Sequence, residues 1–168
     1  MLSIGSKFSA LYRELLQVLA IGLLIGVLGG FAANFFVLGV SYIDGSINGQ
    51  LVDLTVNESV IVRWLALVAA VLLIFLLKRA FSMERWYGPA DTLLYVHRPG
   101  MNFPIKQGFI STGAAFISAS AGASVGQYGP VLHFGASVGA YIKGLLPSRI
   151  SPEVYVACGV AAAISAGF

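Results

Sequence analysis

A glycine-rich turn is the stretch of this chain whose residue types and spacing could bind a ligand. Residues Gly126 to Pro130 read GQYGP and come directly before a segment of helical composition. The turn lies inside 36 residues, Gln107 to Ile142, that contain no Asp, Glu, Lys or Arg. Backbone amides at a helix start are unpaired donors and carry the positive end of the helix dipole. Directed at a cavity within a membrane, these amides would bind an anion without a cationic side chain.

The composition indicates that the turn belongs to a membrane protein. Hydrophobic residues make up 58% of the 168 positions and charged residues 10%, with a mean hydropathy of +0.87, whereas soluble domains carry about 25% charged residues. The net charge of +3 is spread over the ends of apolar runs, which argues against a nucleic-acid partner. The single cysteine, Cys158, predicts neither a disulfide framework nor a cysteine metal site. We therefore expect an integral, multi-pass membrane protein without a metal or another cofactor.

Two long apolar segments, 15–42 and 60–77, are predicted to span the membrane. A short interfacial helix is expected at 1–14, before the first span, and a polar loop at 44–59, between the two spans. The loop contains acidic residues and no basic ones. The basic residues that flank the other ends of this hairpin are Lys7, Arg13, Lys78, Arg79 and Arg85. The positive-inside rule then places the N-terminus in the cytoplasm.

The second half of the chain predicts shorter helices, two of which begin at prolines within the membrane. Pro89 opens a re-entrant helix at 89–97 and Pro130 opens another, since proline is favoured at the first helical position. Asp91 lies in the first turn after Pro89 and is either a cap or a functional acid. The other predicted helices are 105–121, 130–146 and 152–168. Helices interrupted in this way are typical of transporters and channels.

Small residues predict close packing of these helices. Between Gln107 and Ile142, 19 of 36 residues are Gly, Ala or Ser, so backbones are expected to approach one another closely. Within the first span, Gly22, Gly26 and Gly30 recur at every fourth position and predict another close contact. Such packing can bury an irregular turn at membrane depth, where backbone exposed to lipid is not tolerated.

Three motifs resemble the CLC family of chloride channels and chloride/proton exchangers. The run GASVGQYGPVLHFGASVGAYI is similar to the family's second signature, G-x-E-G-P, with the small-residue helix that follows it. Downstream, ACGVAAAISAGF resembles the helix that leads to an Asn-Ala-Pro sequence in this family, and Tyr87-Gly88-Pro89 lies near the place of the first signature, G-S-G-I-P. The resemblance covers roughly Arg85 to Phe168. It implies an all-α membrane bundle with re-entrant broken helices, here an N-terminal fragment with the first inverted repeat only.

The resemblance also implies where anions bind. The candidate residues are Gln127, Tyr128 and Gly129 at an outer site, and Trp86, Tyr87 and Gly88 at an inner one. Most members of the family have a glutamate at the gating position, which is Tyr128 here. Tyrosine, whose pKa is about 10 in solution, stays neutral at ordinary pH, so it can donate to a halide but brings no negative charge. We therefore expect a channel-like pathway, or one without proton coupling.

The implied function is transport of small inorganic anions across the lipid bilayer, with chloride as the expected ion and a homodimer as the full-length assembly. Fluoride or another anion in the same fold, and a non-conducting truncated subunit, are the alternatives. An intramembrane enzyme is disfavoured because Ser124, His133 and Asp91 share no recognised catalytic spacing. His133 is expected to form a hydrogen bond with the backbone or with a neighbouring side chain, and not to bind a metal or relay protons.

Overall fold

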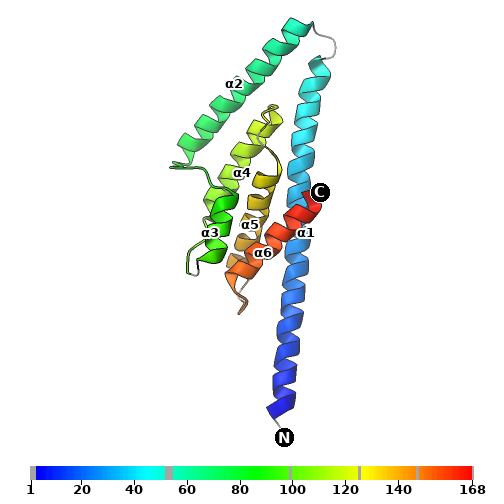
Figure 1. The fold of residues 1–168 in the computed structure, drawn as a ribbon, viewed down its shortest axis with the longest axis vertical. Coiled ribbons are helices and arrows are strands. Elements are labelled where there is room, and N and C mark those ends of the chain that lie inside the picture. Colours follow the sequence, from blue (N-terminus) through cyan, green and yellow to red (C-terminus); the bar gives the residue numbers. More distant parts are fainter. Residues whose placement is uncertain (1–2, 52–54, 99, 125, 147, 168) are drawn as a thin grey trace.

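The computed structural model describes residues 3–51, 55–98, 100–124, 126–146 and 148–167, and this part of the chain is helical, without strands. Its helices are α1 (Ser3–Leu51), α2 (Val56–Ala80), α3 (Pro89–His97), α4 (Ile105–Ser120), α5 (Tyr128–Leu145) and α6 (Pro152–Gly167). In Figure 1, α1 runs along most of the molecule, α2 returns from its upper end and slants away from it, and α3 to α6 group against its middle. The predicted all-α fold class is confirmed. Phe168, at the end of the predicted last helix, lies outside the described residues.

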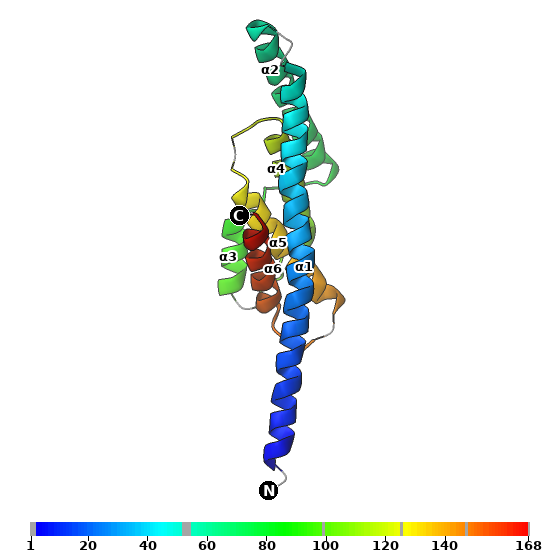
Figure 2. The same ribbon diagram turned by 90° about the vertical axis from the view of Figure 1, so that its right-hand side faces the viewer.

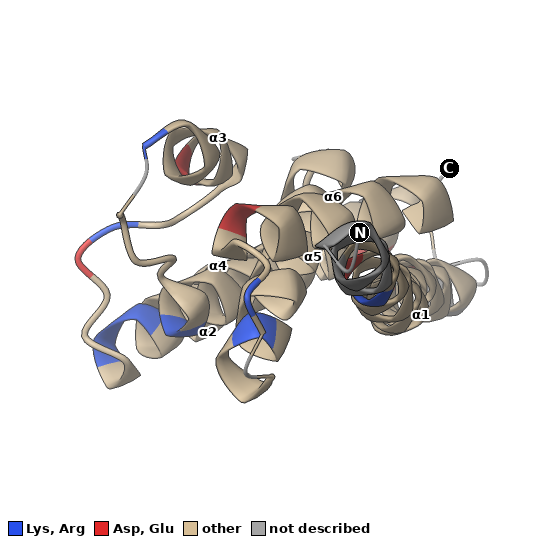
Figure 3. Ribbon diagram, turned by 90° about the horizontal axis from the view of Figure 1, so that it is seen from below, with Lys and Arg blue, Asp and Glu red and all other residues tan. Residues whose placement is uncertain are grey.

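Within the described residues, two helices are long and apolar enough to cross a membrane. These segments are Leu11–Gly49, of 39 residues, and Glu58–Ala80, of 23 residues. Their large apolar side chains mostly face outward, and Phe31 and Phe35 are 73% and 74% exposed. Charged residues lie mainly near helix ends and in connecting loops, so that the helix sides in Figure 3 are almost uncharged. An exposed apolar surface of this kind suits contact with lipid.

The first helix is longer than the sequence predicted. A single helix, Ser3–Leu51, covers the described part of the interfacial helix predicted at 1–14, the span predicted at 15–42 and the beginning of the loop predicted at 44–59. The separate interfacial helix and the early start of the loop were therefore wrong. The polar residues at its end form hydrogen bonds within the helix, where Ser46 Oγ donates to the Tyr42 carbonyl (2.8 Å). Asn48 Nδ2 donates to Asp44 Oδ2 (3.0 Å) in the same way. Polar side chains that find partners one turn away do not end a helix.

The contact between α5 and α6 brings two backbones together. A Cβ atom placed on Gly159 would collide with the carbonyl oxygen of Gly135, and one on Gly135 would collide with that of Gly159. A Cβ on Gly139 would likewise meet the Tyr155 carbonyl oxygen. The predicted backbone-to-backbone packing is thus confirmed at this crossing. It holds α5, and with it the glycine-rich turn, in one position against α6.

The glycine repeat of the first span makes a different contact from the one predicted. A Cβ on Gly22 or Gly26 would have no neighbour within 4 Å, so these two glycines do not lie in a close helix contact. Instead, Gly29 faces Ala162 of α6, at 3.1 Å from a Cβ position, and Gly30 faces Ala166 at 3.7 Å. The approach of α6 along the adjacent face of α1 explains the difference (Figure 2).

Candidate anion site

The starts of α3 and α5 meet in the middle of the bundle. Figures 1 and 2 both show these two helix starts side by side. The Cγ atom of Pro89 lies 3.4 Å from the place that a Cβ atom of Gly129 would occupy. The structure therefore brings the end of one candidate set, Gly88, close to the other candidate set. These residues are separated by about forty positions in the sequence, so only the fold places them together.

The start of α5 lies two residues earlier than predicted. The helix begins at Tyr128, and the Val131 N–H already donates to the Gln127 carbonyl (3.2 Å). Pro130 is thus the third helical residue, where its missing N–H has no intrahelical acceptor to lose. Gln127 makes no side-chain capping hydrogen bond, and the first turn contains no acidic residue. This helix start therefore presents its positive end without a carboxylate of its own.

The start of α3 is different, because a side chain of the protein caps it. The Gly88 N–H donates to Asp91 Oδ2 (2.9 Å), and Arg85 donates to Asp91 Oδ1 (2.5 Å). The Tyr87 N–H donates to Ser111 Oγ of α4 (2.9 Å). Asp91 therefore acts as a cap in this structure. The amides of Tyr87 and Gly88, which the resemblance assigned to an inner anion site, already have acceptors within the protein.

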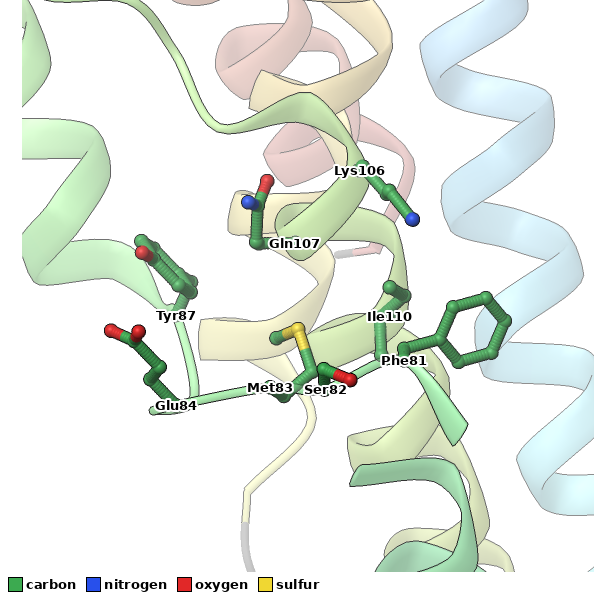
Figure 4. Close-up of a pocket in the computed structure, with 8 residues that line it drawn as sticks. All are labelled: Phe81, Ser82, Met83, Glu84, Tyr87, Lys106, Gln107 and Ile110. Atoms are coloured by element: carbon green, nitrogen blue, oxygen red, sulfur yellow. The ribbon is translucent and has the colours of Figure 1, made fainter. Parts of the chain in front are cut away.

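A polar cavity of about 270 Å³ lies beside this turn (Figure 4). Tyr87 and Glu84 line one side, and Gln107 projects from α4 above them. Lys106 points the other way, with its Nζ 5.6 Å from the centre of the Phe81 ring. Of these lining residues, only Tyr87 was predicted to belong to a site, since nothing in the local sequence pattern brings the start of α4 to the end of α2. The cavity gives the turn before α3 contact with a polar space.

Arg85 lies at the same turn, with its guanidinium 4.1 Å from the centre of the Tyr87 ring. Its hydrogen bond to Asp91 raises the pKa of the guanidinium above the ordinary value. The arginine is therefore a permanent cation at this turn. Its role was not predicted beyond a contribution to membrane orientation.

A buried hydrogen bond joins α3 to α5 just below the two starts. Thr92 Oγ1 and His133 Nδ1 are 2.8 Å apart, and both side chains are buried. Each of these residues lies three positions after the proline of its turn, Pro89 or Pro130, a register that could have suggested the pair. The predicted hydrogen bond of His133 is confirmed. Among the residues that the structure describes, no group of three His, Cys, Asp or Glu side chains could hold a metal ion.

Loss of this hydrogen bond should loosen the joint between α3 and α5. We expect Thr92→Val and His133→Leu each to lower the free energy of unfolding by about 1 to 3 kcal/mol, because each leaves a buried polar partner unsatisfied. In a double-mutant cycle followed by thermal unfolding in detergent, the double variant should be less damaged than the sum of the singles. Thr112→Val is the control, since that hydroxyl bonds only within α4, to the Gly108 carbonyl (3.0 Å). Additive losses for Thr92 and His133 would contradict the contact.

The fold and the site together define a class of protein. An all-helical chain with membrane-length helices, and with two further helices that begin side by side on irregular backbone, is an interrupted-helix membrane protein. The family model described as "Voltage gated chloride channel" matches residues 69–168, from the second part of α2 through α6. The chain belongs to this family, as the three motifs predicted. A comparison with curated proteins finds no match.

Proposed function

We propose that this chain carries small inorganic anions across the membrane, with chloride as the preferred ion and fluoride as the alternative. The observation that supports it most is the start of α5, which has no acid in its first turn and lies against the start of α3. The candidate outer residues Gln127, Tyr128 and Gly129 belong to this start. Amides and hydroxyls of this kind suit a monovalent anion, because they supply donors without a fixed positive charge.

The inner residues Trp86, Tyr87 and Gly88 enter this proposal in a reduced role. Since the amides of Tyr87 and Gly88 donate to Ser111 and Asp91, we assign these residues to the wall of the path and not to direct anion binding. The adjoining polar cavity of about 270 Å³ is large enough to admit a hydrated halide. The α5 start is then the stronger of the two sites.

Transport without proton coupling is the second part of the proposal. Our assignment of Tyr128 to the gating position is supported by its place as the first residue of α5 and by its exposed side chain (58%). A tyrosine brings no carboxylate to this position, so the anion has no acidic side chain there with which to exchange for a proton. The path therefore behaves as a channel or as an uncoupled carrier of anions.

We further infer a multi-pass orientation with the N-terminus in the cytoplasm. The order of charges along α1 and α2 supports it, because Arg13 precedes the first apolar span and Lys78 and Arg79 follow the second. The assembly that the family resemblance implies for the full-length protein is a homodimer.

Anion flux from vesicles tests the proposed function. Full-length protein reconstituted in liposomes should release chloride to a chloride electrode once the membrane potential is collapsed with valinomycin. We expect Gly129→Val to lose most of this flux, because its side chain would fill the space toward Pro89, where even a Cβ is 3.4 Å from Cγ. Gly144→Val is the matched control in the same helix, since a Cβ there has no neighbour within 4 Å. Equal flux in both variants, or none in the wild type, would refute the proposal.

A further inference from the structure

An ion pair occupies the end of α3 that would otherwise attract an anion. Asp91 accepts from the Gly88 N–H and from Arg85, and its side chain is only 15% exposed, whereas that of Arg85 is 58% exposed. The carboxylate is thus an anion tethered at the positive end of the helix. Arg85 balances its charge, so the pair adds almost no net charge to this turn.

The neighbouring start of α5 has no such carboxylate. Its first turn lacks acidic residues, and Gly129 in that turn faces Pro89 of α3. Two different helix starts therefore lie in contact: α3 is capped by the protein's own carboxylate, and the first turn of α5 contains no acidic residue. An anion held at the start of α5 is consequently close to the Arg85–Asp91 pair.

We propose that the Arg85–Asp91 pair sets the affinity of this site for anions, an inference that rests on the proposed function. Asp91 repels an incoming anion and Arg85 attracts it, and the two effects cancel while both charges are present. Removal of the aspartate charge leaves an uncompensated cation and should concentrate anions at the turn. Removal of the arginine charge leaves an uncompensated carboxylate and should exclude them. The Arg85 side chain is 58% exposed and the Gly88 N–H keeps an acceptor at position 91 in each variant, so both variants are expected to fold.

The fluorescence of Trp86 can report whether each variant concentrates or excludes anions at this turn. It is the residue after Arg85 and is 37% exposed, so iodide can quench its fluorescence by collision. The protein is studied in detergent, with Trp64, the other tryptophan of the sequence, replaced by phenylalanine. At low ionic strength we expect Asp91→Asn to raise the iodide quenching constant about two- to fivefold and Arg85→Gln to lower it by a similar factor. The amide oxygen introduced by Asp91→Asn can still accept the Gly88 N–H, so that the cap is retained.

The controls separate charge from structure. The double variant should have the same iodide quenching constant as the parent protein. Added sulfate should reduce the differences between the variants, because salt screens the charges. The neutral quencher acrylamide should quench all variants equally. The proposal would be overturned if both single variants changed the iodide quenching constant in the same direction, or if acrylamide gave the same changes. The pair would then be a structural cap only.

Chloride flux from vesicles keeps this inference separate from the proposed function. At low chloride, Asp91→Asn should increase the flux and Arg85→Gln should decrease it. A wild type without flux, combined with the expected quenching signs, would refute transport while supporting control of anion access by the pair. A wild type with flux, and equal iodide quenching in all variants, would refute the ion-pair proposal and leave transport standing.

Discussion

Tyr128→Glu should give an anion flux that moves protons, which the wild type should not do. The residue opens α5, where the helix dipole favours a negative group. A carboxylate there can occupy the anion site when ionised and leave it when protonated, since the pKa of glutamate is about 4.3 in solution and rises on burial. In liposomes with an imposed chloride gradient, a pH electrode should record proton uptake driven by chloride only for this variant.

Two further substitutions isolate the carboxylate as the cause. Tyr128→Gln has nearly the same shape as Tyr128→Glu but cannot exchange a proton, so it should conduct anions without moving protons. Tyr128→Phe removes the hydroxyl alone and should also remain uncoupled. Chloride-driven proton movement in the wild-type protein that Tyr128→Phe abolishes would show that the tyrosine itself couples the two ions, contrary to our proposal.

Much of the fold was predictable because its signals are local. The short helix expected at 89–97 has the bounds of α3, Pro89 to His97, since proline at a first helical position and polar residues at the end are read within a few residues. The family membership rested likewise on contiguous motifs. The length of α1 was not predictable from composition, because Asp44, Ser46 and Asn48 form hydrogen bonds one helical turn apart. Polar composition alone cannot distinguish such residues from a loop.

The candidate site depended on contacts that the sequence does not display. That Gly129 belongs to an anion site could be proposed from GQYGP, but its contact with Pro89 requires the tertiary fold. The same holds for Ser111, whose hydroxyl oxygen accepts a hydrogen bond from the Tyr87 N–H although the two residues are 24 positions apart. Asp91 was predicted as a cap or a functional acid, and only the structure shows that Arg85 accompanies it. Side-chain partners of this kind decide which helix start remains available to an anion.

Gly159→Ala should destabilise the protein even though alanine is the better helix former. The added Cβ would collide with the Gly135 carbonyl oxygen, which is fixed in the backbone of α5 and cannot rotate away. We expect the free energy of unfolding to fall by about 1 to 3 kcal/mol or more, as for other overpacked cores, after the gain in helix propensity is included. Thermal unfolding in detergent and the yield of monodisperse protein would report the loss. Anion flux should fall with it, since separation of α5 from α6 displaces the start of α5.

Gly26→Ala is the matched control, and it should change the free energy of unfolding in the opposite direction. It is also a glycine inside a long helix, but a Cβ there meets nothing within 4 Å. Alanine should then raise the free energy of unfolding by about 0.5 to 1 kcal/mol through helix propensity alone. The contrast depends on the crossing of α5 and α6, because both substitutions add the same methyl group to the same kind of backbone. If Gly159→Ala were as stabilising as Gly26→Ala, the two backbones could not be as close as the structure places them, and the position of the α5 start would need another explanation.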